Sequence, residues 1–476
     1  MRTWFLLSTA ALLSGCATQQ YQARPLDPAE LAKSYETRTL DSAQLHQFIQ
    51  TSLGQDVTPW PPKSWSGQML TLAAFYYSPD LDAARAKWGT AKAGIVTAAQ
   101  RPNPTLQLPF QYTTNPQSGA SPWTYGLGLD IPIETAGKRG YRVAQAQQLS
   151  DAARFNIGNV AWQVRSRLRA QLLKLYAATR KTSILEQQIA AQRQIVKMLQ
   201  QRLSVGEASA TDVTQQRISL IQSRTDLANA QKQMGDARAQ VASAIGVPVS
   251  AVDGIHISFA EFDRIYPDMP ARDAQRQAIL NRADLLGALA QYQASQEALQ
   301  LAIANQYPDV HLGPGYLWDQ GATKIIFAVT GIALPLFNHN QGPIAEATAR
   351  RAEAEANVKL LQAQAINQTG QALVVYHAAL KGLSQSEALL SAQEQQLSSA
   401  QNSYRAGETD RLMLTLAHQV LFTALLARQN ALMQVQQSLS QIEDAIERPL
   451  DGAVGITRTT LPAPRRDAPA KQGSRP

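Results

Sequence analysis

The chain has 476 residues, of which 45% are hydrophobic and 17% charged, so it has enough apolar material for a sizeable core and is not expected to be disordered throughout. Its formal charge of +8 does not indicate nucleic-acid binding, because five basic residues lie in a Pro- and Ala-rich C-terminal tail and no basic patch with interleaved aromatic residues occurs elsewhere. Only 7% of residues are aromatic, and the frequent Ala, Gln, Leu and Arg favour long helices.

Residues 1–15 have the form of a secretory signal peptide, with Arg2, an apolar run and small residues before Cys16. This is the chain's one cysteine, and a bacterial lipobox uses such a cysteine to carry acyl chains after cleavage before it. The residue after Cys16 is Ala17. An Asp at this position would argue against sorting to the outer membrane. We therefore expect lipidation of Cys16, including palmitate, and a lipid-anchored segment over 16–65. The alternative is an ordinary signal peptide with an incidental cysteine.

The chain beyond this segment consists of two similar halves at an offset of about 200 residues. Asp80 and Leu81 recur as Asp284 and Leu285, and the same offset relates two pairs of prolines and a pair of glycines. Each half has the order helix, strand, strand, long helix, glycine turn, long helix. We predict a first repeat over 66–255 and a second over 272–448.

Alternation of apolar and polar residues predicts two strands in each half, between the shorter helix and the first long helix. The expected strands are about 105–113, 123–132, 309–318 and 324–335. A loop rich in Gly, Pro, Ser, Asn and Gln separates the strands of each half, so two hairpins are predicted. No apolar run beyond the signal reaches the ~20 residues of a membrane-spanning helix, so any crossing of a bilayer would be made by strands.

Two long stretches, 133–247 and 344–448, contain no proline and are free to be helical throughout. The predicted helices of the two hairpins are about 138–204, 209–246, 341–405 and 409–447. Apolar residues recur at every seventh position from Val213 to Val241, a period typical of coiled coils. At about 1.5 Å per residue the first helix would be roughly 95 Å long, a length suited to crossing a compartment.

A glycine turn separates the helices of each predicted hairpin, and helix-start signals follow it. Ser209 and Asp212 form an S-x-x-D start, and Thr409 is expected to cap the corresponding helix of the second half. Asp212 and Asp410 then have two interpretations. They stabilise helix N-termini through the helix dipole, or their copies ring a closed pore in a symmetric assembly.

Four strands are too few to close a membrane barrel. An open sheet edge in hydrocarbon leaves backbone groups unpaired at a cost of several kcal/mol each, and the smallest barrels have about eight strands. Either the strands lie outside a membrane or several chains share one barrel. A trimer would supply twelve strands and would also bundle the long helices into a tube.

Together these features resemble the TolC, or outer membrane efflux protein, family over nearly the whole chain from about Trp65 to Arg448. The resemblance is carried by the two halves and by the following segments: Pro102–Pro104 before the first strand, Ile131–Gly140 at the strand-to-helix junction, and the turns Arg202–Glu207 and Tyr404–Glu408. Glu134–Gly140 looks most like the heavy-metal-efflux branch.

The resemblance implies a mainly α fold with a small membrane β-barrel: a homotrimer with a shared 12-stranded barrel in the outer membrane and an α-helical barrel through the periplasm. It implies a passive channel of a tripartite, RND-type efflux system, partnered by a periplasmic adaptor and an inner-membrane pump. The substrate would be small molecules or metal ions. The hairpin-tip and adaptor-docking residues would be Arg202, Leu203, Gly206, Tyr404, Arg405 and Gly407.

The family also has a gating Asp six or nine positions after the second turn glycine. This chain has Met413 and Leu416 there, so among these positions only Asp212, six after Gly206, matches the pattern. Asp212 is therefore the stronger candidate for a periplasmic constriction and Asp410 the weaker.

The sequence shows no constellation for catalysis: it has no Gly-rich phosphate loop, nucleophile elbow or HExxH motif. No enzyme activity and no cofactor are expected beyond the covalent lipid. The six histidines have no i, i+3 or i+4 spacing, so no metal site is predicted. They are His46, His256, His311, His339, His377 and His418. The last continues the heptad of the second hairpin and is expected to be packed or pore-lining.

The alternative function is a periplasmic coiled-coil adaptor or envelope-spacer lipoprotein without its own pore. An adaptor should have lipoyl-like and β-barrel domains flanking one hairpin, whereas this chain has two equivalent predicted hairpins. The tail over 449–476 is expected to be disordered.

Overall fold

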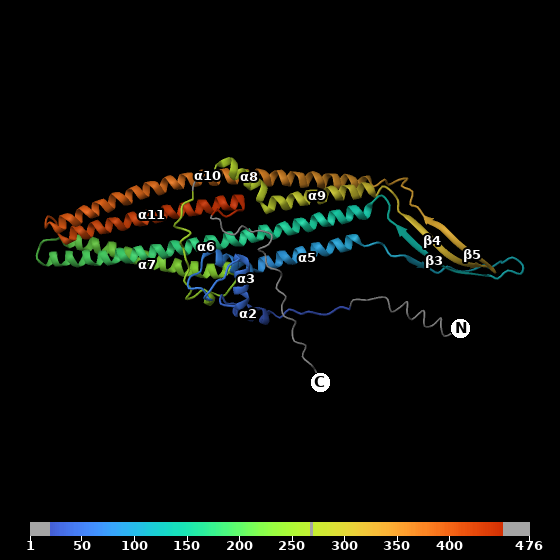
Figure 1. Ribbon diagram of the computed structural model, residues 1–476, viewed down its shortest axis with the longest axis horizontal. Coiled ribbons are helices and arrows are strands. Elements are labelled where there is room, and N and C mark those ends of the chain that lie inside the picture. Colours follow the sequence, from blue (N-terminus) through green and yellow to red (C-terminus); the bar gives the residue numbers. More distant parts are fainter. Residues whose placement is uncertain (1–19, 267–269, 451–476) are drawn as a thin grey trace, which may run out of the picture.

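Long helices and one small sheet form an elongated molecule, with the helical turns at one end and the sheet at the other (Figure 1). The computed structural model describes residues 20–266 and 270–450. Cys16, the signal peptide and most of the C-terminal tail lie outside these residues, as do the predictions made for them. None of the described helices is long and apolar enough to span a membrane.

The helices and strands follow in the order helix, strands, long helical hairpin, and then a second such series. Their bounds are α2 Pro28–Glu36, α3 Ala43–Leu53, α4 Gly67–Tyr77, α5 Pro79–Ala99, β1 Thr105–Gln107, β2 Phe110–Tyr112, β3 Trp123–Ile133, α6 Lys138–Ser204, α7 Ala210–Ile245, the short 3₁₀ helix η1 Val249–Ala251, α8 Ala271–Asn281, α9 Ala283–Ala304, β4 Val310–Asp319, β5 Ala322–Gly331, α10 Gln341–Arg405 and α11 Arg411–Ile446.

The four long helices begin and end within two residues of the positions expected from the sequence. The absence of proline leaves their backbone hydrogen bonds uninterrupted. At the turns, Gly206 and Gly407 have φ of 81° and 78°, the left-handed conformation that glycine adopts without a Cβ clash. The sequence therefore determines where each hairpin reverses.

The strands form one antiparallel sheet rather than two separate hairpins. β1 and β2 both pair with β3, β3 pairs with β4, and β4 pairs with β5. The single strand expected over 105–113 is divided at Leu108 and Pro109, because proline has no N–H to donate to a neighbouring strand. The last strand was expected to reach 335 but ends at Gly331, four residues before Pro335.

The helices lie side by side in a single layer (Figure 1). Towards the sheet the order is α5, α6, α9, α10, and towards the turns it is α7, α6, α11, α10. In the described part of the chain α5 packs extensively only on α6, so its opposite side has no helix neighbour. The layer thus has two open edges, one at α5 and α7 and the other at α10.

The largest hydrophobic core lies near mid-length, where α3, α4 and η1 pack against the long helices. Its largest fully buried side chains include Trp65, Tyr176 and Phe262. Part of the N-terminal segment is attached to this core by Arg38, whose guanidinium donates to the carbonyls of Tyr77 and Gly246 at 3.1 and 2.8 Å. The described part of 16–65 is therefore packed on the helical body.

Candidate functional site

The two hairpins are joined at their tips by an ion pair. Arg202 at the end of α6 donates to Oδ2 of Asp410, which precedes α11. Asp410 also caps α11 by accepting a 2.9 Å hydrogen bond from the amide of Met413. The Met413 amide and then the Arg202 guanidinium hold the pKa of Asp410 below its usual value. One predicted docking residue and one predicted constriction residue thus meet in a single contact.

The second constriction candidate, Asp212, lies in a capping box at the start of α7. Its amide donates to Ser209 Oγ at 3.0 Å, and its carboxylate accepts from the Ser209 amide at 3.2 Å. Its carboxylate is exposed. The helix-start interpretation of Asp212 is correct, and it leaves a pore-lining role open.

The prediction that Thr409 caps α11 is wrong. The cap is Asp410, one residue later, whose extended backbone directs its carboxylate at the Met413 amide. Thr409 instead donates its hydroxyl to the carbonyl of Asp410 at 3.2 Å. A carboxylate competes better than a hydroxyl for a helix N-terminus because its charge also interacts with the helix dipole.

The remaining predicted docking residues lie at the same tip and face solvent. Leu203 and Tyr404 are about two-fifths exposed, at 39% and 41%, and Arg405 is exposed as well. Exposed Val205 and Met413 extend this apolar surface. The tip therefore presents apolar side chains beside the Arg202–Asp410 pair, a composition that suits contact with another protein.

The sheet at the other end has one apolar and one polar face. Side chains directly opposite each other in register share a face, so the pairs formed by Tyr125 with Phe110 and with Trp318 assign the strands' apolar residues to one face. The exposed members of this apolar face are Leu106, Phe110, Tyr112, Trp123, Tyr125, Leu127, Leu129, Tyr316, Ile325, Phe327 and Val329.

Hydrogen-bonded polar side chains occupy the opposite face of the sheet. The hydroxyl of Thr124 donates to Asp319 at 2.7 Å, and Nδ1 of His311 lies 3.0 Å from the carboxylate of Asp130. Such a division suits a wall between an apolar medium and water.

The junction between sheet and helices is fixed by Lys138 at the start of α6. Its ammonium group donates to the carboxylate of Asp309 at 2.8 Å and to the carbonyl of Tyr307 at 2.7 Å. Arg142 pairs with Glu134 in the same segment. The motif Glu134–Gly140 thus has a structural task, which is to fix the direction in which α6 leaves the sheet.

A buried ionic cluster, which no local sequence pattern indicates, connects α6 to α11 near mid-length. Glu443, only 1% exposed, lies 3.1 Å from Arg165 and 3.2 Å from Arg169. Next to it, Asp444 accepts from the indole of Trp162 at 2.9 Å and from the hydroxyl of Ser166 at 2.8 Å. Burial raises the pKa of Asp444. These partners are far apart in sequence, so local spacing could not reveal them.

The end of α11 carries a second perturbed carboxyl. The carboxyl of Glu447 accepts a 2.7 Å hydrogen bond from the amide of Ala283, beside the ion pair of Arg282 and Asp284. Burial raises the pKa of Glu447 to about 7. This carboxyl therefore changes charge near neutral pH.

Metal-ligating side chains do not gather in groups of three or more anywhere in residues 20–266 or 270–450. His418 is half-buried on α11. The features described above are surfaces: the tips, the two-faced sheet and the open edges of the helical layer.

The chain is similar in sequence and in fold to known proteins. The profile of the family described as "Outer membrane efflux protein" matches residues 74–247. The cobalt-zinc-cadmium resistance protein CzcC of Cupriavidus metallidurans is 25% identical over 412 residues, 84% of this chain and 95% of that protein. The outer membrane protein VceC of Vibrio cholerae has the same fold, with a TM-score of 0.63 and 20% identity over 79% of this chain and 95% of that one.

Over residues 74–247 the chain matches the outer membrane efflux protein family. The resemblance predicted from the sequence is confirmed. A further relative, the pyoverdine export outer membrane protein OpmQ of Pseudomonas aeruginosa, is 22% identical over 364 residues, which are 72% of this chain and 74% of that protein.

The relatives and structural neighbours place the chain in the outer membrane, with its helices extending into the periplasm. The family and fold that it matches are those of outer membrane efflux channels, which are not enzymes. The apolar face of the sheet is the surface suited to lipid, and the hairpin tips at the far end lie away from that membrane.

Proposed function

We propose that this protein is the outer-membrane channel of a tripartite, RND-type efflux system, a passive duct built from three copies of the chain. The observation that carries the proposal is the sheet, which has an exposed apolar face and open edges at β1, β2 and β5. Within hydrocarbon those edges would leave backbone N–H and C=O groups unpaired at several kcal/mol each. Edge-to-edge pairing with further copies removes that cost.

Three copies fit the dimensions of such a barrel. Because β1 and β2 follow one another along β3, each chain supplies four strand positions. Two copies would give eight and three would give twelve, and twelve leaves a lumen in place of a side-chain core. The helical layer also has two open edges, so contacts between neighbouring copies would close a helical tube as well.

The helical tips would receive a periplasmic adaptor that connects the duct to an inner-membrane pump. Leu203, Tyr404 and Arg405 are exposed there, as an adaptor-binding surface requires. The pair Arg202–Asp410 would hold the two hairpins together in the closed duct, and its separation would allow the tips to move apart. Asp212 would line the constriction when three copies meet.

We infer that the substrates are divalent metal ions. The match to CzcC covers more of this chain and has higher identity than the match to OpmQ, whose name indicates export of an organic siderophore. The metal ions would pass through as cargo. A lipid on Cys16 would provide a second attachment to the outer membrane besides the barrel.

The proposal is tested by deleting the gene and measuring growth inhibition by cobalt, zinc and cadmium salts and by a panel of organic toxicants. We expect sensitivity to the metals, restored by the wild-type chain. A matched variant, Phe327→Asp, should not restore resistance, because it places a charge on the lipid-facing side of the sheet, whereas Lys197→Gln on exposed α6 should. Sensitivity to organic compounds alone would reassign the substrate, and no sensitivity would favour the spacer alternative.

A further inference from the structure

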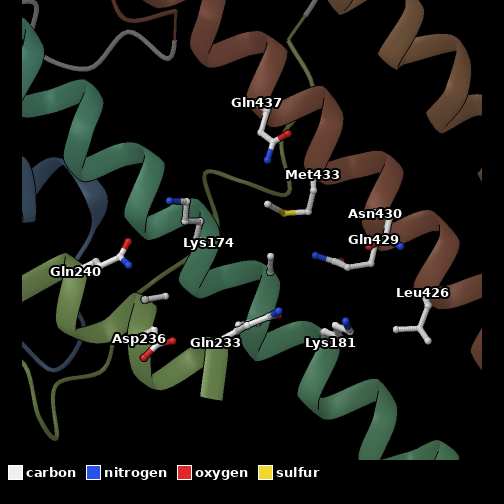
Figure 2. Close-up of a pocket in the computed structure, with 13 residues that line it drawn as sticks. Lys174, Lys181, Gln233, Asp236, Gln240, Leu426, Gln429, Asn430, Met433 and Gln437 are labelled. Carbon is white, nitrogen blue, oxygen red and sulfur yellow. The ribbon is translucent and has the colours of Figure 1, made fainter. Parts of the chain in front are cut away.

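A groove with both polar and apolar lining lies between three helices on the hairpin side of the core (Figure 2). Its volume is about 460 Å³. The floor contains Ala177 and Ala178 of α6 and Ala237 of α7, small side chains that leave space where leucine would fill it. The walls combine the apolar Leu426 and Met433 with polar side chains. The polar ones are Lys174, Lys181, Gln233, Asp236, Gln240, Gln429, Asn430 and Gln437.

One wall residue has a buried hydrogen-bond donor without an acceptor. Gln429 is 8% exposed, and its amide nitrogen is buried with no hydrogen-bond partner in the described part of the chain. Figure 2 shows the side chains of Gln429 and Gln233 extending from α11 and α7 into the space between the helices. A buried amide donor without an acceptor is unfavourable, so an acceptor bound in the groove would be stabilising.

Two lysines on α6 add positive charge to the same groove. Lys174 and Lys181 are seven residues apart and therefore share one face of the helix. Within the described residues neither forms an ion pair, and the one carboxylate of the groove, Asp236, forms none either. The groove thus carries a net positive charge together with neutral amide donors.

We propose that this groove binds a small organic polycarboxylate. A carboxylate oxygen would accept from Gln429, and the other carboxylates would pair with Lys174 and Lys181. The amides of Gln233 and Asn430 can donate to a hydroxyl or a carboxylate. A ligand of about ten heavy atoms fits within 460 Å³.

The site would be complete in a single chain, because all three helices belong to one protomer and α6 already packs on both α7 and α11. The inference therefore stands independently of the proposed export function. A bound polycarboxylate would connect α6, α7 and α11 and would stabilise their present arrangement by mass action.

The test is isothermal titration of citrate, as the probe polycarboxylate, into the detergent-purified full chain at constant ionic strength. We expect a Kd of about 1 mM or tighter. Lys174→Gln with Lys181→Gln should raise this Kd at least about tenfold through the loss of charge-assisted hydrogen bonds. Gln429→Leu, which preserves bulk and removes the buried donor, should raise it severalfold. Lys197→Gln, on an exposed part of α6 outside the groove, should leave it unchanged.

Two results would overturn the proposal. One is the absence of citrate binding by the wild-type chain up to about 10 mM, which needs no variant. The other is an equal Kd for the wild type and the double lysine variant, which would show only non-specific attraction to the basic protein. Melting temperatures without citrate serve to verify that the variants are folded.

Discussion

At the scale of single residues, the structure is most constrained where charge is buried. Glu443 lies between Arg165 and Arg169 and also accepts the amide proton of Leu450 at 2.8 Å. One carboxylate thus compensates two guanidinium groups in the interior of the helical layer. Removing one member of such a cluster is costly because the remaining charges stay buried without a counter-charge.

We expect Glu443→Gln to destabilise the folded chain by about 3 kcal/mol or more, because it preserves side-chain size but removes the counter-charge of both arginines. The measurement is thermal or denaturant unfolding in detergent. The matched control is Glu387→Gln, since Glu387 pairs with Arg428 at the surface and is 44% exposed. Its loss should change stability by less than about 1 kcal/mol. Equal effects of the two substitutions would contradict the importance of burial.

Glu447 should make stability depend on pH. Its pKa is about 7 in the folded chain, above the ordinary 4.5. Near pH 4.5 the carboxyl is mostly protonated in the folded chain and burial costs little. As pH rises towards 7 the unfolded chain releases its proton first, so the folded chain loses up to about 3 kcal/mol of stability.

Glu447→Gln acts as a permanently protonated form. The melting temperature of this variant should therefore equal that of the wild type near pH 5 and exceed it at pH 8. A wild-type advantage at pH 8 would show that the ionised carboxylate is stabilised in the folded chain.

At the scale of elements, the hairpins were predictable and the connections between them were not. Proline-free stretches, the heptad from Val213 and the turn glycines are local signals, so they place α6, α7, α10 and α11 within two residues. Asp410 shows the limit of such signals. The sequence contains two adjacent cap-forming residues, and the choice of Asp410 over Thr409 goes with the Arg202 side chain, which comes from another hairpin.

The tip contact can be separated from the helix cap by two substitutions of Asp410. Asparagine is as good a cap as aspartate but removes the charge that attracts Arg202. Asp410→Asn should therefore raise channel conductance or open probability in planar bilayers while hydrogen exchange at the start of α11 stays unchanged.

Asp410→Ala should change both quantities, and Arg193→Gln on the exposed part of α6 should change neither. Wild-type conductance in the Asp410→Asn channel would show that the ion pair does not hold the tips together.

Some features of the candidate site can likewise be predicted from local sequence, and others depend on residues far apart in the chain. The alternation in 123–132 predicted an apolar strand face, and the structure places that face on one side of a single sheet. The division of the first strand follows from Pro109, which has no N–H to donate to the neighbouring strand. The pairing of β3 with β4 and the cluster around Glu443 depend on residues far apart in the chain, and no local pattern specifies them.

For the whole molecule, the most informative features are the open edges of the sheet and of the helical layer. The sheet has an edge at β1 and β2 and another at β5, and the helical layer ends at α5 and α7 on one side and at α10 on the other. If copies of the chain join side by side around a rotation axis, the open edges of the sheet and of the helical layer are covered together. A closed ring of this kind also leaves no free edge from which a filament could grow. This geometry is what links the fold to a duct.

The most direct test of this claim is native mass spectrometry of the full-length protein released from detergent micelles. We expect one dominant species of three chains, because three copies supply the twelve strands of a barrel that has a lumen. A protein that remains a single chain under conditions that preserve other outer-membrane oligomers would contradict the shared barrel and the proposed duct with it.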